Sequence, residues 1–208
     1  LLIGADQENS NAEGHAGAVY LVRGGAHLAV GGTVDLADLM TALPGNLAQI
    51  LPPPGSVEFH FGATAQIADL DGNARGEVIV AATVERAGAT LRAAGAPVGS
   101  AHGSAGAPDG AIYIAWDDNF AGVWPAGFSI SLDAAPGATS EVAGGVLNIA
   151  FGEEILGGLD FDDDGNADLF VGDIIGVWTG GFRFHSGSGH LIYNAASLRG
   201  APAFDLDN

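Results

Sequence analysis

The sequence contains no cysteine and no lysine, and its apolar runs are short. Without cysteine, the chain can form no disulfide bond, no thiolate metal site and no cysteine nucleophile. No apolar run approaches the roughly 20 residues that a membrane-spanning helix needs, so we predict a soluble chain without membrane insertion. A basic region typical of a signal peptide is also lacking, so an export signal would lie upstream of Leu1.

Positive charge is scarce as well. Six arginines stand against 25 acidic residues, which gives a formal net charge of −19. Nucleic-acid phosphates and anionic membrane surfaces attract positively charged proteins, so no nucleic-acid partner is expected. Strong acidity suits multivalent cations and a calcium-rich exterior. Because disulfide bonds are excluded, bound metal is the obvious means of stabilising an extracellular fold.

Three segments of the chain share one order of features, which indicates an internal repeat. Each contains short runs rich in β-branched and aromatic residues, bounded by Gly, Asp and Pro, and the runs EVIVAA, GAVYLV, GAIYIAW and FSISLD are predicted to be strands. These runs are too short for helices. One local helical turn is predicted in the segment LADLMTALPGNLAQIL, and residues 87–110 are expected to form a long surface loop.

The sequence therefore predicts a single all-β domain over residues 1–208, made of about three four-stranded units. Tandem units of this kind favour the blades of a β-propeller over a stacked β-solenoid. The first unit starts at its second strand, and AFDLDN at the end of the chain aligns with an outer strand, so the propeller would be incomplete and completed by other segments or copies. The expected boundaries are about 1–52 for repeat 1, 56–135 for repeat 2 and 145–208 for repeat 3.

Residues 160–168 (DFDDDGNAD) hold five aspartates in nine positions. Alternate positions of a tight turn can direct their side chains to one centre, and Gly165 permits the bend. Hard oxygen ligands favour Ca²⁺ over zinc or copper. An EF-hand would need a glutamate where Val171 stands, so the loop leads into a strand, and a metal-free acidic turn remains the alternative. The predicted ligands are Asp160, Asp162, Asp164, the carbonyl of Asn166, and Asp168 at loop positions 1, 3, 5, 7 and 9.

The second repeat contains a related loop, DLDGNARGE. An asparagine replaces one carboxylate, and Ala74 stands where the other loop has glycine. Fewer charges and a stiffer turn predict a weaker calcium site. Its predicted ligands are Asp69, Asp71, Asn73, the carbonyl of Arg75, and Glu77, again at positions 1, 3, 5, 7 and 9.

These motifs resemble the FG-GAP repeats of integrin α-subunit headpieces and related bacterial surface proteins. Phe61-Gly62 and Phe151-Gly152 match the Phe-Gly element, the two acidic loops match the D-x-D-x-D-G-x-x-D element, and AGAVYLV, GAIYIAW and GHLIYNA match the Gly-x-Val-Tyr-Val element. The resemblance covers nearly the whole chain. It implies a propeller-type fold with calcium in the loops between strands 1 and 2 of a blade.

No catalytic motif accompanies these features. His185 and His190 flank SGSG without a G-x-S-x-G or H-E-x-x-H spacing, so we interpret them as loop residues. Trp116, Trp124 and Trp178 are interpreted as packing or interface residues rather than a sugar-stacking surface. The sequence thus predicts a non-catalytic, calcium-binding, extracellular module for cell-surface adhesion or structural assembly.

Two alternatives remain open at this point. One is a self-assembling subunit of a filament or surface layer, and the other is an accessory module of a secreted hydrolase. The expected partners are other proteins, copies of the chain itself, or a cell-surface glycan or protein ligand, none of which the sequence can name.

Overall fold

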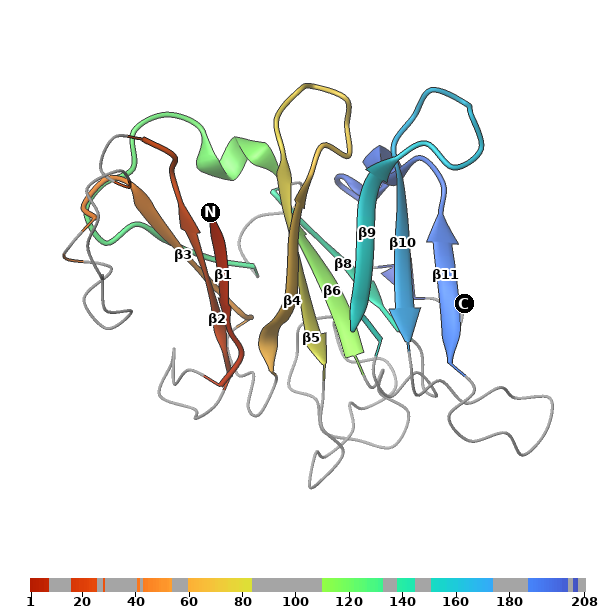
Figure 1. Ribbon diagram of the computed structural model, residues 1–208, viewed down its shortest axis with the longest axis horizontal. Coiled ribbons are helices and arrows are strands. Elements are labelled where there is room, and N and C mark those ends of the chain that lie inside the picture. The colour runs from red at the N-terminus through yellow and green to blue at the C-terminus, as the bar shows by residue number, and fades with distance from the viewer. Residues whose placement is uncertain are drawn as a thin grey trace.

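The computed structural model shows an all-β protein built from three sheets that lie side by side (Figure 1). It describes residues 1–7, 16–25, 28, 41, 43–53, 60–83, 110–132, 138–144, 151–173, 187–201 and 204–205. The first sheet contains β1 (Leu2–Ala5), β2 (Ala18–Val22), β3 (Leu47–Leu51) and β7 (Ser129–Ser131). The second contains β4 (Phe61–Ala68), β5 (Glu77–Thr83), β6 (Gly110–Ala115), β8 (Thr139–Ala143) and β12 (Phe204–Asp205). The third contains β9 (Glu154–Leu159), β10 (Asp168–Asp173) and β11 (Ser188–Ile192).

The second and third sheets follow one plan. An acidic loop joins β4 to β5 and β9 to β10, and β6 and β11 then pair antiparallel with β5 and β10. A short 3₁₀ turn follows each of these strands, η3 (Asp117–Phe120) after β6 and η4 (Ala195–Leu198) after β11. In the first sheet, β1, β2 and β3 correspond to β5, β6 and β8. The described strands therefore repeat in space, as the sequence predicted.

After each 3₁₀ turn, a short strand crosses to the preceding sheet. The strand β7 pairs parallel with β3 of the first sheet, and β12 pairs parallel with β8 of the second. The prediction that AFDLDN forms an outer strand of the third unit is therefore wrong for Phe204 and Asp205. A strand that leaves its own sheet ties neighbouring sheets together through backbone hydrogen bonds.

The predicted strands in EVIVAA, GAVYLV, GAIYIAW and FSISLD are confirmed as β5, β2, β6 and β7. In the segment 36–51, where one local helical turn was expected, Thr41 is helical. Residues 47–51 form β3, in which Leu47, Ala48 and Ile50 are buried. The long surface loop expected at 87–110 lies outside the described residues except for Gly110, which begins β6.

Two apolar clusters hold the three sheets together. One lies between the first and second sheets and includes Val19, Ile50, Val80 and Tyr113. The other lies between the second and third sheets and includes Ile79, Ile114, Leu169 and Val171. Alternate residues of β5 face opposite clusters, so the middle sheet is buried on both faces and its strands read as continuous apolar runs.

Each Phe-Gly pair packs against the preceding sheet. Phe61 and Phe151 are fully buried, and Gly62 and Gly152 both have φ of +94°. A Cβ atom on Gly62 would lie 2.8 Å from the Ala18 carbonyl oxygen, so only glycine permits this approach of two backbones. The pair thus serves as the point at which one sheet is fixed to the next.

Candidate metal centre

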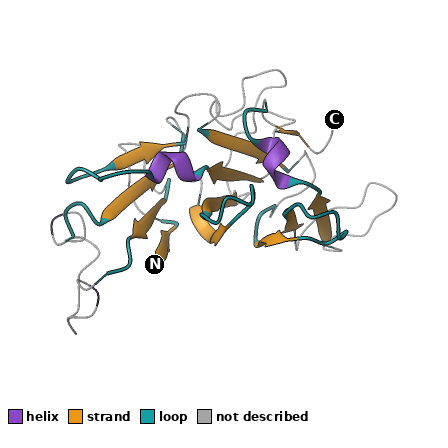
Figure 2. Ribbon diagram, turned by 90° about the horizontal axis from the view of Figure 1, so that it is seen from above, coloured by secondary structure: helices purple, strands orange, loops and turns teal. Residues whose placement is uncertain are grey.

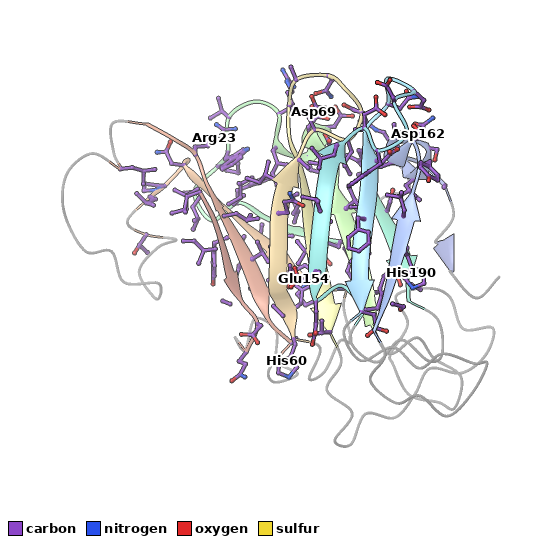
Figure 3. The ribbon with its side chains drawn as sticks, turned by 45° about the vertical axis from the view of Figure 1, so that its right-hand side comes forward. Arg23, His60, Asp69, Glu154, Asp162 and His190 are labelled. Carbon is purple, nitrogen blue, oxygen red and sulfur yellow. The ribbon has the colours of Figure 1, made fainter. Side chains whose placement is uncertain are left out.

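The two acidic loops emerge from the same end of neighbouring sheets. Figure 3 shows Asp69 and Asp162 at this end, whereas His60, Glu154 and His190 lie toward the other end. The 3₁₀ turns η3 and η4 lie at the loop end as well (Figure 1, Figure 2). The plan of the fold therefore brings both predicted sites to one end of the molecule.

The acidic side chains of both loops receive hydrogen bonds from their own backbone. Asp69 accepts bonds from the amides of Gly72, Asn73 and Ala74 at 2.8–3.1 Å. Asp160 accepts bonds from the amides of Asp164 and Gly165 at 3.1 and 2.8 Å. Positions 3 and 5 repeat the same pattern, since Asp71 and Asp162 accept from position 5, and Asn73 and Asp164 accept from position 7.

The backbone of the two loops is also the same at positions 4 and 6, where φ is positive. Gly72 and Asp163 stand at position 4 with φ of 74° and 63°, and Ala74 and Gly165 stand at position 6 with φ of 64° and 88°. An alanine in the left-handed region is strained relative to glycine. This is a physical reason for the prediction that the loop containing Ala74 is the weaker site.

Three carboxylates converge in each loop. Oxygen atoms of Asp69, Asp71 and Glu77 lie within 4.8 Å of one another, and so do oxygen atoms of Asp160, Asp162 and Asp168. These residues occupy positions 1, 3 and 9, so the structure brings together three of the five predicted ligands of each loop. The acidic clusters could therefore hold a metal ion.

The predicted ligands at positions 5 and 7 do not belong to these carboxylate groups and are linked to each other by hydrogen bonds. The side chain of Asp164 accepts hydrogen bonds from the amide and the side chain of Asn166, at 2.8 and 3.0 Å. These bonds lower the pKa of Asp164. Asn73 accepts the amide of Arg75 at 2.8 Å. Hydrogen bonds between positions 5 and 7 thus stabilise the conformation of each loop.

The acid at position 9 is fully buried in both loops. Glu77 accepts the Leu70 amide at 2.6 Å, and Asp168 accepts the amides of Phe161 and Asn194 at 2.8 and 2.9 Å. The second side-chain oxygen of Glu77, Oε1, is buried and accepts no hydrogen bond from the described residues. A buried carboxylate oxygen without a donor is costly, and a cation would compensate it.

The electrostatics of both loops also favour a cation. Burial raises the pKa of Glu77, and the negative charges of Asp71 and Asp117 add to the rise against the opposing effect of the Leu70 amide. Desolvation within the loop and the charges of Asp164, Asp168 and Asp160 raise the pKa of Asp162. Carboxylates that resist ionisation in each other's presence become favourable ligands when a positive ion lies between them.

The structure adds a residue that the sequence did not indicate. Arg199, directly after η4, donates a hydrogen bond to Asp71 at 2.8 Å and another to Asp118, and its guanidinium lies over the ring of Trp116 at 5.3 Å. Arg199 and Asp71 are 128 positions apart, so no local pattern could have revealed the contact. An arginine of the third repeat therefore neutralises a predicted ligand of the second.

Other sequence interpretations have mixed outcomes. His190 is not a loop residue but part of β11, where its Nε2 lies 3.4 Å from Ser188 Oγ and its ring meets Phe151 edge-on. Trp116 and Trp124 are buried packing residues, as predicted, and Trp116 donates to Ser140 Oγ at 2.9 Å. His185 and Trp178 lie outside the described residues.

No protein-family model matches the chain, and no curated protein matches it in sequence. Within the described part of the chain, no helix is long and apolar enough to cross a membrane. The role of the two loops is therefore inferred from their residues and geometry.

Proposed function

We propose that the chain is a non-catalytic, calcium-binding module of an extracellular protein, with β-propeller-like blades, which acts in cell-surface adhesion or structural assembly. The observation that supports this proposal best is the duplication of the carboxylate group. Two loops, 91 residues apart at their first aspartates (69 and 160), carry oxygen ligands at positions 1, 3 and 9 on one backbone conformation.

Calcium is the cation that fits these loops. Each offers only oxygen ligands, and the described residues place no histidine in either carboxylate group. Calcium accepts six to eight oxygen ligands in a flexible arrangement, whereas magnesium demands a tight octahedron and loses its water reluctantly. The loops between first and second strands are also where the resemblance to FG-GAP repeats places calcium.

We expect isothermal titration of metal-free protein with calcium to reveal two sites of unequal affinity. The tighter site is the loop 160–168, which has one more carboxylate among its predicted ligands and a glycine at position 6, and the weaker is the loop 69–77. Magnesium should compete poorly at both. A folded protein that gives no binding heat, and no calcium-dependent change in its spectra, would contradict the proposal.

Arg199→Gln is expected to raise the calcium affinity of the weaker loop about tenfold. At an effective dielectric constant of about 20, repulsion between the arginine charge and a nearby bound ion weakens binding by on the order of 1–3 kcal/mol. The substitution frees Asp71, to which Arg199 donates. Calorimetry of the weaker site measures the change.

Arg75→Gln is the matched control for this prediction. Arg75 belongs to the weaker loop, 69–77, and its guanidinium pairs weakly with Asp117 at 3.5 Å and is largely exposed. Its loss should therefore change the calcium affinity far less than the loss of Arg199. An unchanged or lower affinity in Arg199→Gln would show that the arginine orders Asp71 for binding instead of competing with the ion.

A further inference from the structure

The outer face of the third sheet carries most of the large apolar side chains that the described residues expose. Leu156 of β9 pairs with Phe170 of β10, which pairs in turn with Leu191 of β11, so these three side chains form one row across the sheet. Leu156 and Leu191 are 41% and 37% exposed. Towards the acidic loop the same patch continues with Leu159, Phe161 and Tyr193, which are 47%, 45% and 54% exposed.

The equivalent positions of the second sheet are completely covered. Paired by strand register and loop position, Phe161 corresponds to Leu70, Phe170 to Ile79, Leu191 to Ile114 and Tyr193 to Trp116. These four counterparts are at most 1% exposed because the third sheet packs on them. The patch is thus a sheet-binding face of the same construction, and in the third sheet it faces solvent.

The outer face of the first sheet is not available as its complement. Ala18, Tyr20, Val22 and Leu47 point to that side and are at most 4% exposed, in contact with Leu43. A head-to-tail stack of copies would need two open apolar faces, one at each side of the molecule. A two-fold pair needs only one, because an isologous interface uses the same patch on both subunits.

We propose that the outer face of the third sheet binds the same face of a second copy of this chain, which gives a two-fold dimer. Five side chains exposed by 37–54% leave about 400 Å² of apolar surface, roughly half of what one partner contributes to a standard interface. The patch forms the apolar centre, and Glu154 and Ser188 stand near its rim as polar exposed residues. A two-fold axis perpendicular to the strands sets the two acidic loops at opposite ends, which keeps like charges apart.

This inference goes beyond the proposed function and does not depend on calcium. The dimer is expected to have a dissociation constant on the order of micromolar, given its modest area. Because each copy carries a formal charge of −19, the association requires physiological salt, which screens charges more than about 8 Å apart. Calcium titration and association are separate measurements, so either proposal can fail without the other.

Sedimentation of the full chain over a dilution series in the micromolar range, with calcium and with chelator, tests the dimer. The wild type should shift from dimer to monomer, and Leu156→Asn and Leu191→Asn should each raise the dissociation constant at least about tenfold. Ile67→Asn is the matched control, since Ile67 is 45% exposed but lines a hollow with Leu21 on the side of the first sheet. It should leave the dimer unchanged.

Circular dichroism identifies any variant that fails to fold. If one of Leu156→Asn and Leu191→Asn does not fold, the other is used to test the dimer. Monomers at every concentration would overturn the proposal and would indicate that the patch binds a different protein. Open-ended growth beyond the dimer, or a dimer weakened equally by Ile67→Asn, would overturn it as well.

Discussion

Replacement of Phe151 by alanine is expected to lower the free energy of unfolding by about 3–5 kcal/mol, a large part of the 5–15 kcal/mol typical of a domain. The ring is fully buried in the cluster between the second and third sheets. A Cβ atom at Gly144 would lie 2.4 Å from Cβ and Cγ of Phe151, and one at Gly110 would lie 2.7 Å from its carbonyl oxygen. With backbone this close, the site cannot collapse onto the missing ring, and a cavity remains.

Urea denaturation of dilute protein measures this loss as a lower midpoint at an unchanged slope. Phe161→Ala is the matched control, because it removes the same ring from a side chain that is 45% exposed. It should cost under about 1 kcal/mol. Equal losses in the two variants would show that Phe151 does not join the second and third sheets.

The features predicted correctly from the sequence are those that depend on residues close together in the chain. The strands β5 and β6 are continuous apolar runs because both faces of the middle sheet are buried, and the acidic loops are recognisable because their carboxylates alternate along a few positions. Even the buried acid at position 9 follows from the loop spacing, although its complete burial does not.

The features that were missed depend on contacts between distant segments. Strands were predicted in FSISLD and AFDLDN, but not the pairing of the three-residue β7 and the two-residue β12 with β3 and β8 of the preceding sheet. One local signal was available, since a Pro-Ala pair stands shortly before a phenylalanine at both places, WPAGF and APAF. The role of Arg199 had no such signal, because its partner belongs to another repeat.

The exposure of the outer face of the third sheet could not be predicted from the sequence either. Leu156, Phe170 and Leu191 look like core residues, and by pattern alone they match side chains that are buried in the second sheet. Exposure depends on which sheet lies next to them, and that is a property of the assembled fold. The pattern of a single strand therefore predicts that a face is apolar but not what covers it.

Removal of calcium is expected to lower the free energy of unfolding by about 2.7 kcal/mol for each site that had been held at a hundredfold excess over its dissociation constant. An ion bound at the converging carboxylates would stabilise only the native state, because these carboxylates, whose oxygen atoms lie within 4.8 Å of one another in the fold, are dispersed in the unfolded chain. Thermal unfolding with calcium and with chelator measures the difference. The melting temperature should fall on chelation, and protease cleavage within the loops should become faster.

Two neighbouring acids of the loop 160–168 distinguish a metal site from a merely acidic turn. Asp162→Asn removes a charge from the converging group and should abolish most of the calcium-dependent stability of that site. Asp163→Gly is the matched control, because Asp163 lies outside the group and has the left-handed backbone that Gly72 has in the other loop. It should retain the calcium response.

In the presence of chelator, the order of stability of the wild type and Asp162→Asn should reverse. Desolvation within the loop, together with the charges of Asp164, Asp168 and Asp160, raises the pKa of Asp162 in the folded protein, so its ionised form opposes folding at neutral pH. A neutral side chain at position 162 removes that cost. Asp162→Asn should therefore be at least as stable as the wild type without calcium and less stable with it. If the two variants instead respond alike under both conditions, the loop binds no ion, and its aspartates serve only the turn.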